Sequence, residues 1–364
     1  MSLEKQLNIP WGKIAIALIL ALVSAEIIVR LFISSPSRQL FDAELGYRYK
    51  PNSWYFNGQE GGAYNRINNI GLFDDDLPVA GRSKNIAVLG DSFVESLQLP
   101  VKQNFMSLLE QRWPDVSVIN GGQGAFNPSH YPYVLERILT KTEVDLTILF
   151  LHPGELNGLV NDSVDFVIDD SGAIVDITPK PNSDDGLKKL VEPLITRSAF
   201  FSHFFRQIKP VFDDTKDKIK ALLTKKKHSS EPEATASTDI KTLIAEFGSE
   251  RFSVILKKLN LLSNNNLLVV YFSEIGYGLN AKTTRYQTLN EGPVFEHAAN
   301  SLGIPVFDLS SDLERYYHQT HQPPRGFHNL SLSDGHLNKA GHRVIADALE
   351  NIIHSQFPEL EVNQ

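Results

Sequence analysis

The chain of 364 residues contains no cysteine. This absence excludes a disulfide framework, a thiolate metal site and a cysteine nucleophile. Cationic side chains are also in the minority, because 35 Lys and Arg stand against 43 Asp and Glu, which gives a formal net charge of −8. A surface that binds nucleic acid needs the opposite balance, so we expect no nucleic-acid partner.

Two common ligand-binding patterns are missing as well. The 11 histidines show no His-Glu-x-x-His or comparable metal-ligand spacing. The segment Gly121-Gly122-x-Gly124 lacks the Lys-Ser/Thr that completes a phosphate-binding loop. We therefore expect neither a metal nor a cofactor. The apolar content of 42% and the charged content of 21% are ordinary, and they allow a sizeable buried core.

The longest apolar run is Ile14–Ile33, which reads IAIALILALVSAEIIVRLFI. As a helix it spans about 30 Å, the thickness of the hydrocarbon core of a bilayer. Glu26 and Arg30 interrupt it, but they lie four residues apart on one helical face, where they can pair or reach toward the interface. The competing interpretation is a cleaved signal peptide, with small residues at Ala21–Ala25. No small-x-small site is followed by a polar start, so we predict an uncleaved anchor over 14–33 after a tail of residues 1–13.

Residues 34–82 are rich in Gly, Asn, Tyr and Asp and have few periodic apolar positions. Such a composition predicts extended and turning structure. We expect this lead-in segment to pack on the following domain and cover one edge of its sheet.

Five short apolar runs, separated by helical patterns, follow the lead-in segment. They are Ile86–Leu89 (with Asn85), Val116–Asn120, Leu146–Leu151, Leu267–Phe272 and Ile304–Asp308. Helical patterns cover Val94–Leu109, Pro132–Leu139, Thr288–Leu302 and Lys339–Ile353. Continuous apolar strands between helices indicate a parallel sheet covered on both faces. We predict an α/β domain over 83–358, with a five-stranded parallel sheet in a flavodoxin-like three-layer α/β/α sandwich.

An insertion over 164–247 separates the third and fourth predicted strands. A hairpin is predicted over Val164–Ile177, around Asp170-Ser171-Gly172. Leu187–Leu223 has helical periodicity and a stripe of phenylalanines, for which packing is the favoured interpretation and a lid facing substrate or membrane is the alternative. Residues 225–238 contain few apolar side chains and are predicted to be disordered.

A serine follows the first predicted strand directly, in Gly90-Asp91-Ser92-Phe93. At a strand-to-helix turn its hydroxyl would lie over a helix N-terminus, where free N–H groups favour developing negative charge. That environment suits a nucleophile, although Asp91 or Ser92 would also serve simply as a helix cap. A second motif far along the chain, Asp334-Gly335-His336, precedes the last predicted helix. A base and a carboxylate that orients it are the groups that a nucleophilic serine needs.

Together these motifs resemble the SGNH, or GDSL, hydrolase superfamily. Gly90-Asp91-Ser92-Phe93 matches its first block, and Asn120-Gly121-Gly122-Gln123-Gly124 is similar to the second. Asp334-Gly335-His336-Leu337-Asn338 is similar to the fifth. The span Phe41 to Ser92 looks like that of membrane-anchored bacterial members, and the resemblance covers most of Phe41–Leu349 apart from the insertion.

The resemblance implies a role for each matching residue. Ser92 would be the nucleophile, His336 the base and Asp334 the acid that orients it. The oxyanion hole would take the N–H groups of Ser92 and Gly124. The family usually places the acid three residues before the histidine, where this chain has Ser333, so Asp334 departs from the pattern by one position.

The third block departs further. The family places Gly-x-Asn-Asp or Gly-Asn-Asp after the third strand, whereas this chain has His152-Pro153-Gly154-Glu155-Leu156-Asn157. Either Asn157 reaches the oxyanion hole from a lengthened loop or Glu155 takes the place of the asparagine. An ionised glutamate only accepts hydrogen bonds, so it would serve poorly unless protonated. We expect Asn157 to be the third donor.

The sequence therefore predicts a membrane-anchored serine esterase that acts through an acyl-serine intermediate, with an ester or an acylated cell-envelope carbohydrate as its substrate. One alternative is a polysaccharide O-acetyltransferase or deacetylase with the same site. Another is a non-catalytic carbohydrate-binding or assembly protein of the same fold. The resemblance implies a single-pass protein of the bacterial inner membrane, with its globular part outside the cytoplasm.

Overall fold

The computed structural model describes residues 11–152, 154–160, 164–180, 186–208, 248–278, 282–286 and 291–360. The chain divides into two compact units. The smaller unit takes in Met1–Arg38 and Leu187–Ser229, and the larger one takes in Gln39–Gly186 and Ser230–Gln364.

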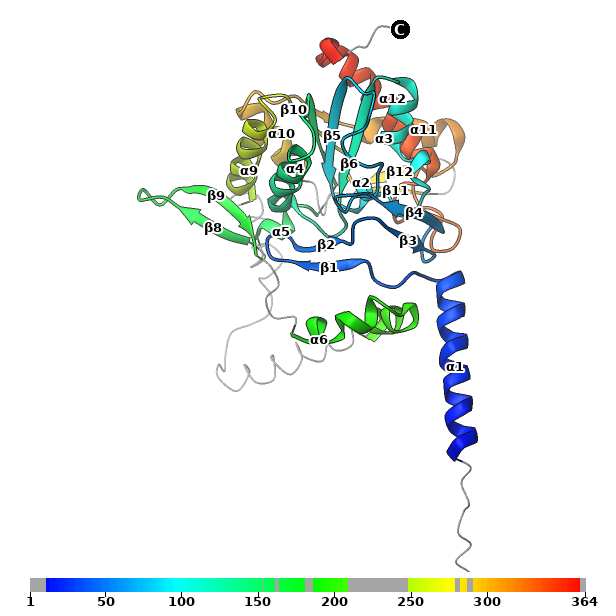
Figure 1. The fold of residues 1–364 in the computed structure, drawn as a ribbon. Helices are drawn as coiled ribbons and strands as arrows, with labels where there is room; N and C mark the ends of the chain where they lie inside the picture. The colour runs from blue at the N-terminus through cyan, green and yellow to red at the C-terminus, as the bar shows by residue number, and fades with distance from the viewer. Residues whose placement is uncertain are drawn as a thin grey trace, which may run out of the picture. The chain divides into compact units, whose positions relative to one another are not determined.

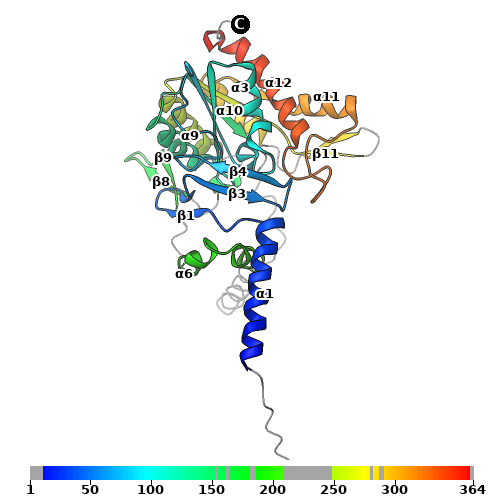
Figure 2. The ribbon, with the colours of Figure 1, turned by 45° about the vertical axis from the view of Figure 1, so that its right-hand side comes forward.

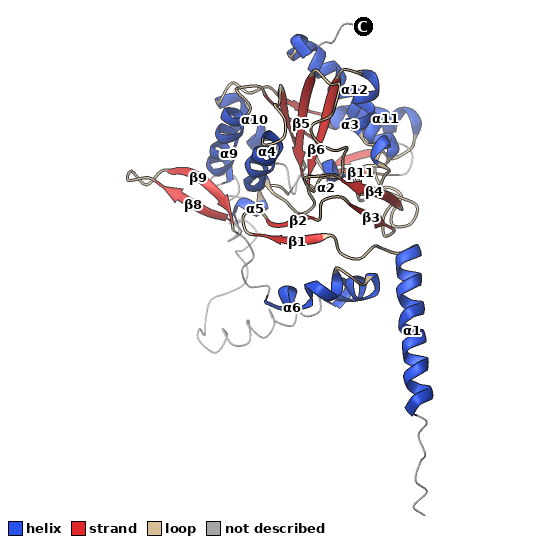
Figure 3. Ribbon diagram, in the orientation of Figure 1, coloured by secondary structure: helices blue, strands red, loops and turns tan. Residues whose placement is uncertain are grey.

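The larger unit is built on a five-stranded parallel sheet (Figures 1 and 3). Its strands are β5 (Lys84–Gly90), β6 (Val116–Gly122), β7 (Leu146–Leu151), β10 (Leu267–Tyr271) and β13 (Val306–Asp308). They lie in the order β13-β10-β7-β5-β6, and every neighbouring pair is parallel. Of these five strands, β5 comes first in the chain and lies between β6 and β7, the second and the third, which is the flavodoxin-like order. The predicted fold class is confirmed.

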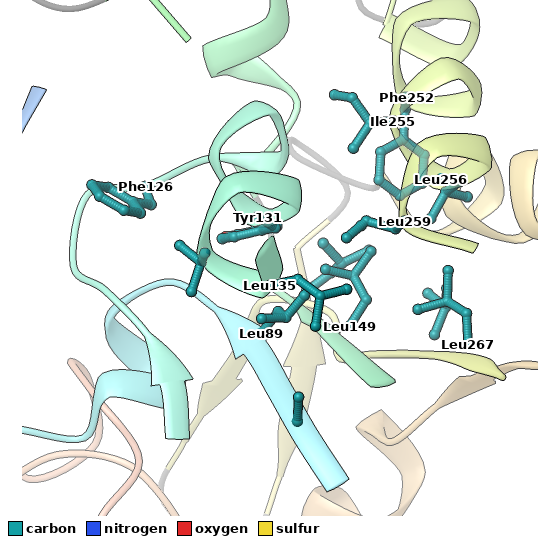
Figure 4. Close-up of a cluster of buried hydrophobic side chains, with 14 of the residues drawn as sticks. Leu89, Phe126, Tyr131, Leu135, Leu149, Phe252, Ile255, Leu256, Leu259 and Leu267 are labelled. Carbon is teal, nitrogen blue, oxygen red and sulfur yellow. The ribbon is translucent and has the colours of Figure 1, made fainter. Parts of the chain in front are cut away.

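Helices cover both faces of this sheet. One layer contains α4 (Tyr131–Leu139), α9 (Ser249–Leu262) and α10 (Gly292–Ser301), and the other contains α3 (Phe105–Arg112), α11 (Ser310–Thr320) and α12 (Lys339–Gln356). Successive strand residues point to opposite faces, so Leu89 and Leu149 pack with the first layer, whereas Val88 and Ile148 pack with the second. Figure 4 shows the first of these two cores, between the sheet and α4 and α9. Burial on both faces explains why the strands are apolar throughout.

In the described part of the chain, four antiparallel hairpins accompany the sheet. They are β1 (Gln39–Asp42) with β2 (Gly46–Tyr49), β3 (Ser53–Asn57) with β4 (Ala63–Ile67), β8 (Val164–Ile168) with β9 (Ile174–Pro179), and β11 (Ile275–Tyr277) with β12 (Thr283–Arg285). The hairpin predicted at the start of the insertion is therefore present. In its turn, the Asp169 carboxylate accepts hydrogen bonds from the N–H groups of Ser171 and Ala173. The segment 225–238, predicted to be disordered, lies outside the described residues.

The helix expected over Val94–Leu109 is wrong as one continuous element. The short helix α2 (Ser92–Glu95) ends at Ser96, whose φ of 58° is left-handed. A 3-10 turn over Val101–Gln103 follows, and α3 begins only after Asn104, whose side chain accepts from the Ser107 N–H. Pro100 explains the interruption, because proline has no N–H to donate and clashes with the preceding turn of a helix.

The smaller unit contains α1 (Trp11–Phe32), α6 (Gly186–Ile195) and a further helical stretch over 199–208. Within the described residues, α1 is long and apolar enough to cross a membrane, a property that signal sequences share. Arg30 Nε lies 2.5 Å from Glu26 Oε1, so these two side chains form the pair that their spacing suggested.

Candidate active site

Ser92 lies at the edge of the sheet where the parallel strands end. Strand β5 stops at Gly90, and α2 begins at Ser92 after Asp91, whose carboxylate caps the helix by accepting the Phe93 N–H at 2.9 Å. The neighbouring strand β6 allows this close approach only because it ends in glycine. A Cβ at Gly122 would lie 2.1 Å from the Glu95 nitrogen.

His336 approaches Ser92 from the loop before α12. Its Nε2 lies 2.8 Å from the Ser92 Oγ, although the two residues are 244 positions apart in the chain. The loop is held from both sides: the Gly326 N–H donates to the His336 carbonyl at 2.8 Å, and the Arg325 guanidinium donates to the Gly335 carbonyl, also at 2.8 Å. The serine and histidine expected from the sequence are thus brought into hydrogen-bonding contact.

The carboxylate that meets His336 comes from Glu60. Its Oε2 lies 2.6 Å from His336 Nδ1, and its Oε1 accepts the His336 backbone N–H at 2.9 Å. Glu60 stands in the turn between β3 and β4, and the residue is only 7% exposed. Burial by itself would raise the pKa of this carboxyl, but the hydrogen bonds and the charge of His336 bring the pKa below its ordinary value. Glu60 is therefore held as a carboxylate.

Asp334 does not occupy the position expected for it. Its side chain is 79% exposed, and its Oδ1 accepts the Gly335 N–H at 2.7 Å. The reason lies in Gly335, which has a φ of +96° and whose Cβ position would fall 2.6 Å from Glu60 Oε1. The glycine of the Asp-Gly-His motif makes room for the Glu60 carboxylate, so our expectation that Asp334 contacts His336 was wrong.

The turn that carries Glu60 is joined to the loop that carries His336 at a second point. Asn329 accepts the Gly61 N–H at 2.9 Å, and its amide donates to the Gly58 carbonyl at 3.1 Å. Sequence reasoning missed Glu60 because it is 276 positions from His336, in a glycine-rich turn of a segment that we expected only to pack. No spacing along the chain signals such a contact.

The structure describes the three residues expected to donate to the oxyanion to different extents. Ser92 begins α2, and Asn157 begins α5 (Asn157–Val160), but the side chain of Asn157 lies outside the described part of the structure. The Gly124 backbone lies beside the carboxyl of Glu95, since a Cβ at Gly124 would fall 2.9 Å from Glu95 Oε2. Burial raises the pKa of Glu95 to about 7, against the opposing hydrogen bonds from Tyr49 and Gly124.

Glu155, the other candidate in the third block, is buried at 5% exposure. The Tyr131 hydroxyl lies 2.9 Å from each of its two carboxyl oxygens. Burial, and then the negative charge of Asp91, raise the pKa of Glu155 well above its ordinary value. Protonation would leave this glutamate with one O–H donor. Its loop is fixed by Glu291, which accepts the Gly154 N–H at 3.1 Å.

Aromatic rings surround the serine and histidine. The Phe93 ring stacks on His152 with 4.2 Å between ring centroids, and lies 5.1 Å from the His336 ring. The Arg325 guanidinium, only 5% exposed, lies 5.4 Å from the Phe93 centroid and donates to Glu274 at 2.8 Å. Among the residues that the structure describes, no cluster of three or more His, Asp or Glu side chains could hold a metal ion.

No protein-family model and no curated protein sequence matches the chain. Solved structures similar to it include a member of the lipolytic protein G-D-S-L family from Veillonella parvula, at 12% identity, with a TM-score of 0.37, covering 76% of this chain and 100% of that one. Another is an acetyl xylan esterase, AlAXEase, at 13% identity and a TM-score of 0.39, covering 74% of this chain and 99% of that one. A third is a two-domain esterase active on acetylated mannans, at 14% identity and a TM-score of 0.39, covering 78% of this chain and 52% of that one.

Proposed function

We propose that the chain is a serine ester hydrolase in which Ser92, His336 and Glu60 form the catalytic triad. The observation that carries this proposal is the continuous row of contacts from Ser92 Oγ to His336 Nε2 at 2.8 Å and from His336 Nδ1 to Glu60 at 2.6 Å. This is the arrangement that an activated serine requires, with a base beside the hydroxyl and a carboxylate behind the base. Glu60 takes the role that the family resemblance assigned to Asp334.

The reaction proceeds in two acyl transfers. In the first, Ser92 Oγ attacks the ester carbonyl while His336 Nε2 takes its proton, and the imidazolium then gives that proton to the departing alcohol. In the second, water attacks the acyl-serine carbonyl while His336 Nε2 takes its proton, and the imidazolium then gives that proton to Ser92 Oγ as the carboxylic acid leaves. Glu60 fixes the orientation of the imidazole and stabilises the positive charge that the ring acquires in each step.

The oxyanion formed in each step needs N–H or O–H donors. We propose the N–H of Ser92, at the start of α2, and the amide of Asn157 for this role. Glu155 is the second candidate for the third block, because a neutral carboxyl can donate. The Gly124 N–H is a further proposed donor, and the Glu95 carboxyl beside it competes for that hydrogen. Each donor of this kind typically stabilises the transition state by about 3 kcal/mol.

The substrate that we propose is an acylated carbohydrate of the cell envelope. An exposed aromatic pair supports this choice: Trp54 and Tyr64 stack at 5.3 Å and are 49% and 61% exposed. They lie on β3 and β4, the two strands joined by the turn that carries Glu60. Exposed aromatic faces on a scaffold already tied to the catalytic residues suit the C–H face of a sugar ring. Replacing Trp54 by Ala should raise the KM for an acetylated oligosaccharide and leave that for p-nitrophenyl acetate unchanged.

We further propose that α1 remains as an uncleaved anchor and holds the catalytic unit on the outer side of the bacterial inner membrane. The length and apolar composition of α1 support the anchor, whereas the outer placement follows from the family resemblance alone. A sugar hydroxyl in place of water would make the same site an O-acetyltransferase, which remains the alternative. A carbohydrate-binding protein without catalysis is the third possibility, and it predicts no reaction at Ser92.

The test is labelling of the full chain, in detergent, with a fluorophosphonate probe. The wild type should be labelled at Ser92, and Ser92→Ala and His336→Ala should not be. Glu60→Gln should be labelled much more slowly, and Asp334→Asn at the normal rate. A folded wild type that takes no label would refute the proposed activity and favour the binding protein. If labelling occurs, an acetyl donor supplied with and without a sugar acceptor separates transfer from hydrolysis.

A further inference from the structure

The insertion is attached to the anchor helix by a half-buried carboxylate, that of Glu26. Glu26, on α1, accepts hydrogen bonds from the Ser198 hydroxyl at 2.7 Å and from the N–H groups of Ala199 and Phe200 at 3.0 and 2.9 Å. These two N–H groups lie at the start of the helical stretch 199–208, where a helix leaves its N–H groups without internal partners. The carboxylate of one helix thus caps another that is more than 170 residues away.

Two further contacts hold the same segment to this end of α1 and to the chain just after it. The Arg30 guanidinium donates to the Arg197 carbonyl at 2.7 Å, and the Ser37 N–H donates to the Ile195 carbonyl at 2.9 Å. Glu26 stands six residues before Phe32, the last residue of α1, which corresponds to about 9 Å along the helix axis. That depth matches the boundary between headgroups and acyl chains, where amphipathic helices settle about 5–10 Å into a bilayer.

The insertion carries large apolar side chains that the protein itself does not cover. Leu190 is 77% exposed, Leu194 46% and Phe204 51%. A groove of about 620 Å³ lies between α1 and this segment, and its walls are mostly apolar, with Leu22 and Ile27 on one side and Leu194 and Phe201 on the other. In water these side chains would be unfavourably placed, at about 25 cal/mol for each Å² of apolar surface.

The orientation of the segment also fits a membrane surface. In both ribbon views α6 and the helical stretch after it run across the direction of α1 (Figures 1 and 2). Helices that cross a spanning helix near its end lie along the plane of the bilayer. Arg197 and Arg206 are exposed on the same segment, where long cationic side chains can reach the headgroup layer.

We propose that residues 186–208 form an interfacial segment that lies in the membrane surface, with Leu190, Leu194 and Phe204 in contact with lipid and with Glu26 as its tether to the anchor. This inference depends on the anchor role proposed for α1 and does not depend on the catalytic role of Ser92. It assigns the exposed part of the phenylalanine stripe to lipid contact, which the sequence had left as the less favoured interpretation.

Because the chain has no cysteine, a fluorophore attached to a single introduced cysteine labels only that position. Such variants therefore test whether the segment lies in the membrane surface. The full chain is reconstituted in phosphatidylcholine–phosphatidylglycerol vesicles with an environment-sensitive fluorophore at position 190 or 204, through Leu190→Cys or Phe204→Cys. Two sets of quencher lipids are used, one with a nitroxide near the headgroup for the shallow positions 190 and 204, and one with a nitroxide deep in the acyl chain for position 20. Leu20→Cys on α1 is the positive control, and Leu261→Cys on α9, also a strongly exposed leucine at 67%, is the matched control.

We expect quenching and a blue-shifted emission at 190 and 204, and neither at 261. Unquenched probes at 190 and 204 with the emission wavelength of a probe in water, together with a quenched probe at 20, would refute the interfacial segment. The anchor role of α1 would still hold. A probe at 20 that is also unquenched would overturn both. Labelling by fluorophosphonate is measured on the same samples. A failure of the catalytic proposal would appear there as missing label, independently of the quenching result.

The tether is tested by Glu26→Leu, which removes the carboxylate and keeps the helix apolar. Quenching at 204 should fall to the level seen at 261, whereas quenching at 20 should be retained. Ser24→Leu, a polar-to-apolar change two residues earlier on the exposed surface of α1, should leave the probe at 204 quenched. Unchanged quenching at 204 in Glu26→Leu would refute the tether.

Discussion

Replacing Glu60 by Gln removes the negative charge behind His336 and retains the shape of the side chain. The charge centres of the imidazolium and the carboxylate are about 4 Å apart, and at an effective dielectric constant of about 20 their attraction is about 4 kcal/mol. That energy is lost in the transition state, where the ring is charged, so kcat should fall by about a thousandfold. The corresponding change in serine-protease triads costs about 10⁴ in kcat.

The assay is hydrolysis of p-nitrophenyl acetate by the full chain in detergent, with the thermal unfolding midpoint measured in parallel. Glu60→Gln should unfold near the wild-type temperature, so that the loss of kcat is not a loss of folded protein. Asp334→Asn is the matched control, and its exposed side chain predicts a change of about twofold or less. The reverse pattern, with Asp334→Asn as inactive as Ser92→Ala and Glu60→Gln fully active, would refute the assignment.

Three further predictions concern the surroundings of this site. Gly335→Ala should reduce both kcat and thermal stability, because a side chain at φ +96° is strained and its Cβ would lie 2.6 Å from Glu60 Oε1; wild-type values for both would contradict the geometry. Asn329→Ala should lose two hydrogen bonds worth about 1 kcal/mol each and slow kcat several-fold without changing the KM, and a selective rise in KM would count against a positioning role. Glu95→Gln should gain stability relative to wild type as the pH rises. The pKa of Glu95 is raised from 4.5 to about 7, so the folded wild type binds this proton more tightly than the unfolded chain does. The free energy of unfolding of the wild type therefore falls by about 3 kcal/mol as the pH rises from 4.5 to about 7. Denaturant unfolding of both proteins at pH 5 and pH 8 checks this, and a constant difference would show that Glu95 does not titrate as described.

The sheet was predictable because its determinants are local. Strands buried on both faces, such as Leu146–Leu151, are short apolar runs whatever they pair with, and their alternation with helices leaves few possible topologies. Ser92 and His336 were predictable for a related reason. Each stands in a compact motif at a strand or helix boundary, where the neighbouring residues that shape the turn are also visible in the sequence.

Glu60 was not predictable from the same information. Its role depends on a contact between a hairpin turn and a distant loop, and the residues that make this possible, Gly335 and Asn329, have ordinary local explanations. The break in the helix after Ser92 was missed for the opposite reason: Pro100 was visible, but the apolar periodicity on both sides of it was given more weight. Pattern reasoning thus located the strands and the compact motifs, but it extended one helix across a proline and missed a contact between two distant loops.

The position of Glu60 in a separate turn has a consequence for how the sequence of such a protein can evolve. The carboxylate and the Ser92–His336 pair belong to separate structural pieces that share no short motif. The two pieces meet through Glu60, Gly335 and Asn329, so substitutions elsewhere in either piece leave the contact between them in place. A survey that looks for the acid only beside the histidine would class chains of this kind as having lost it. The third partner would be found by asking which side chain fills the space that Gly335 leaves open.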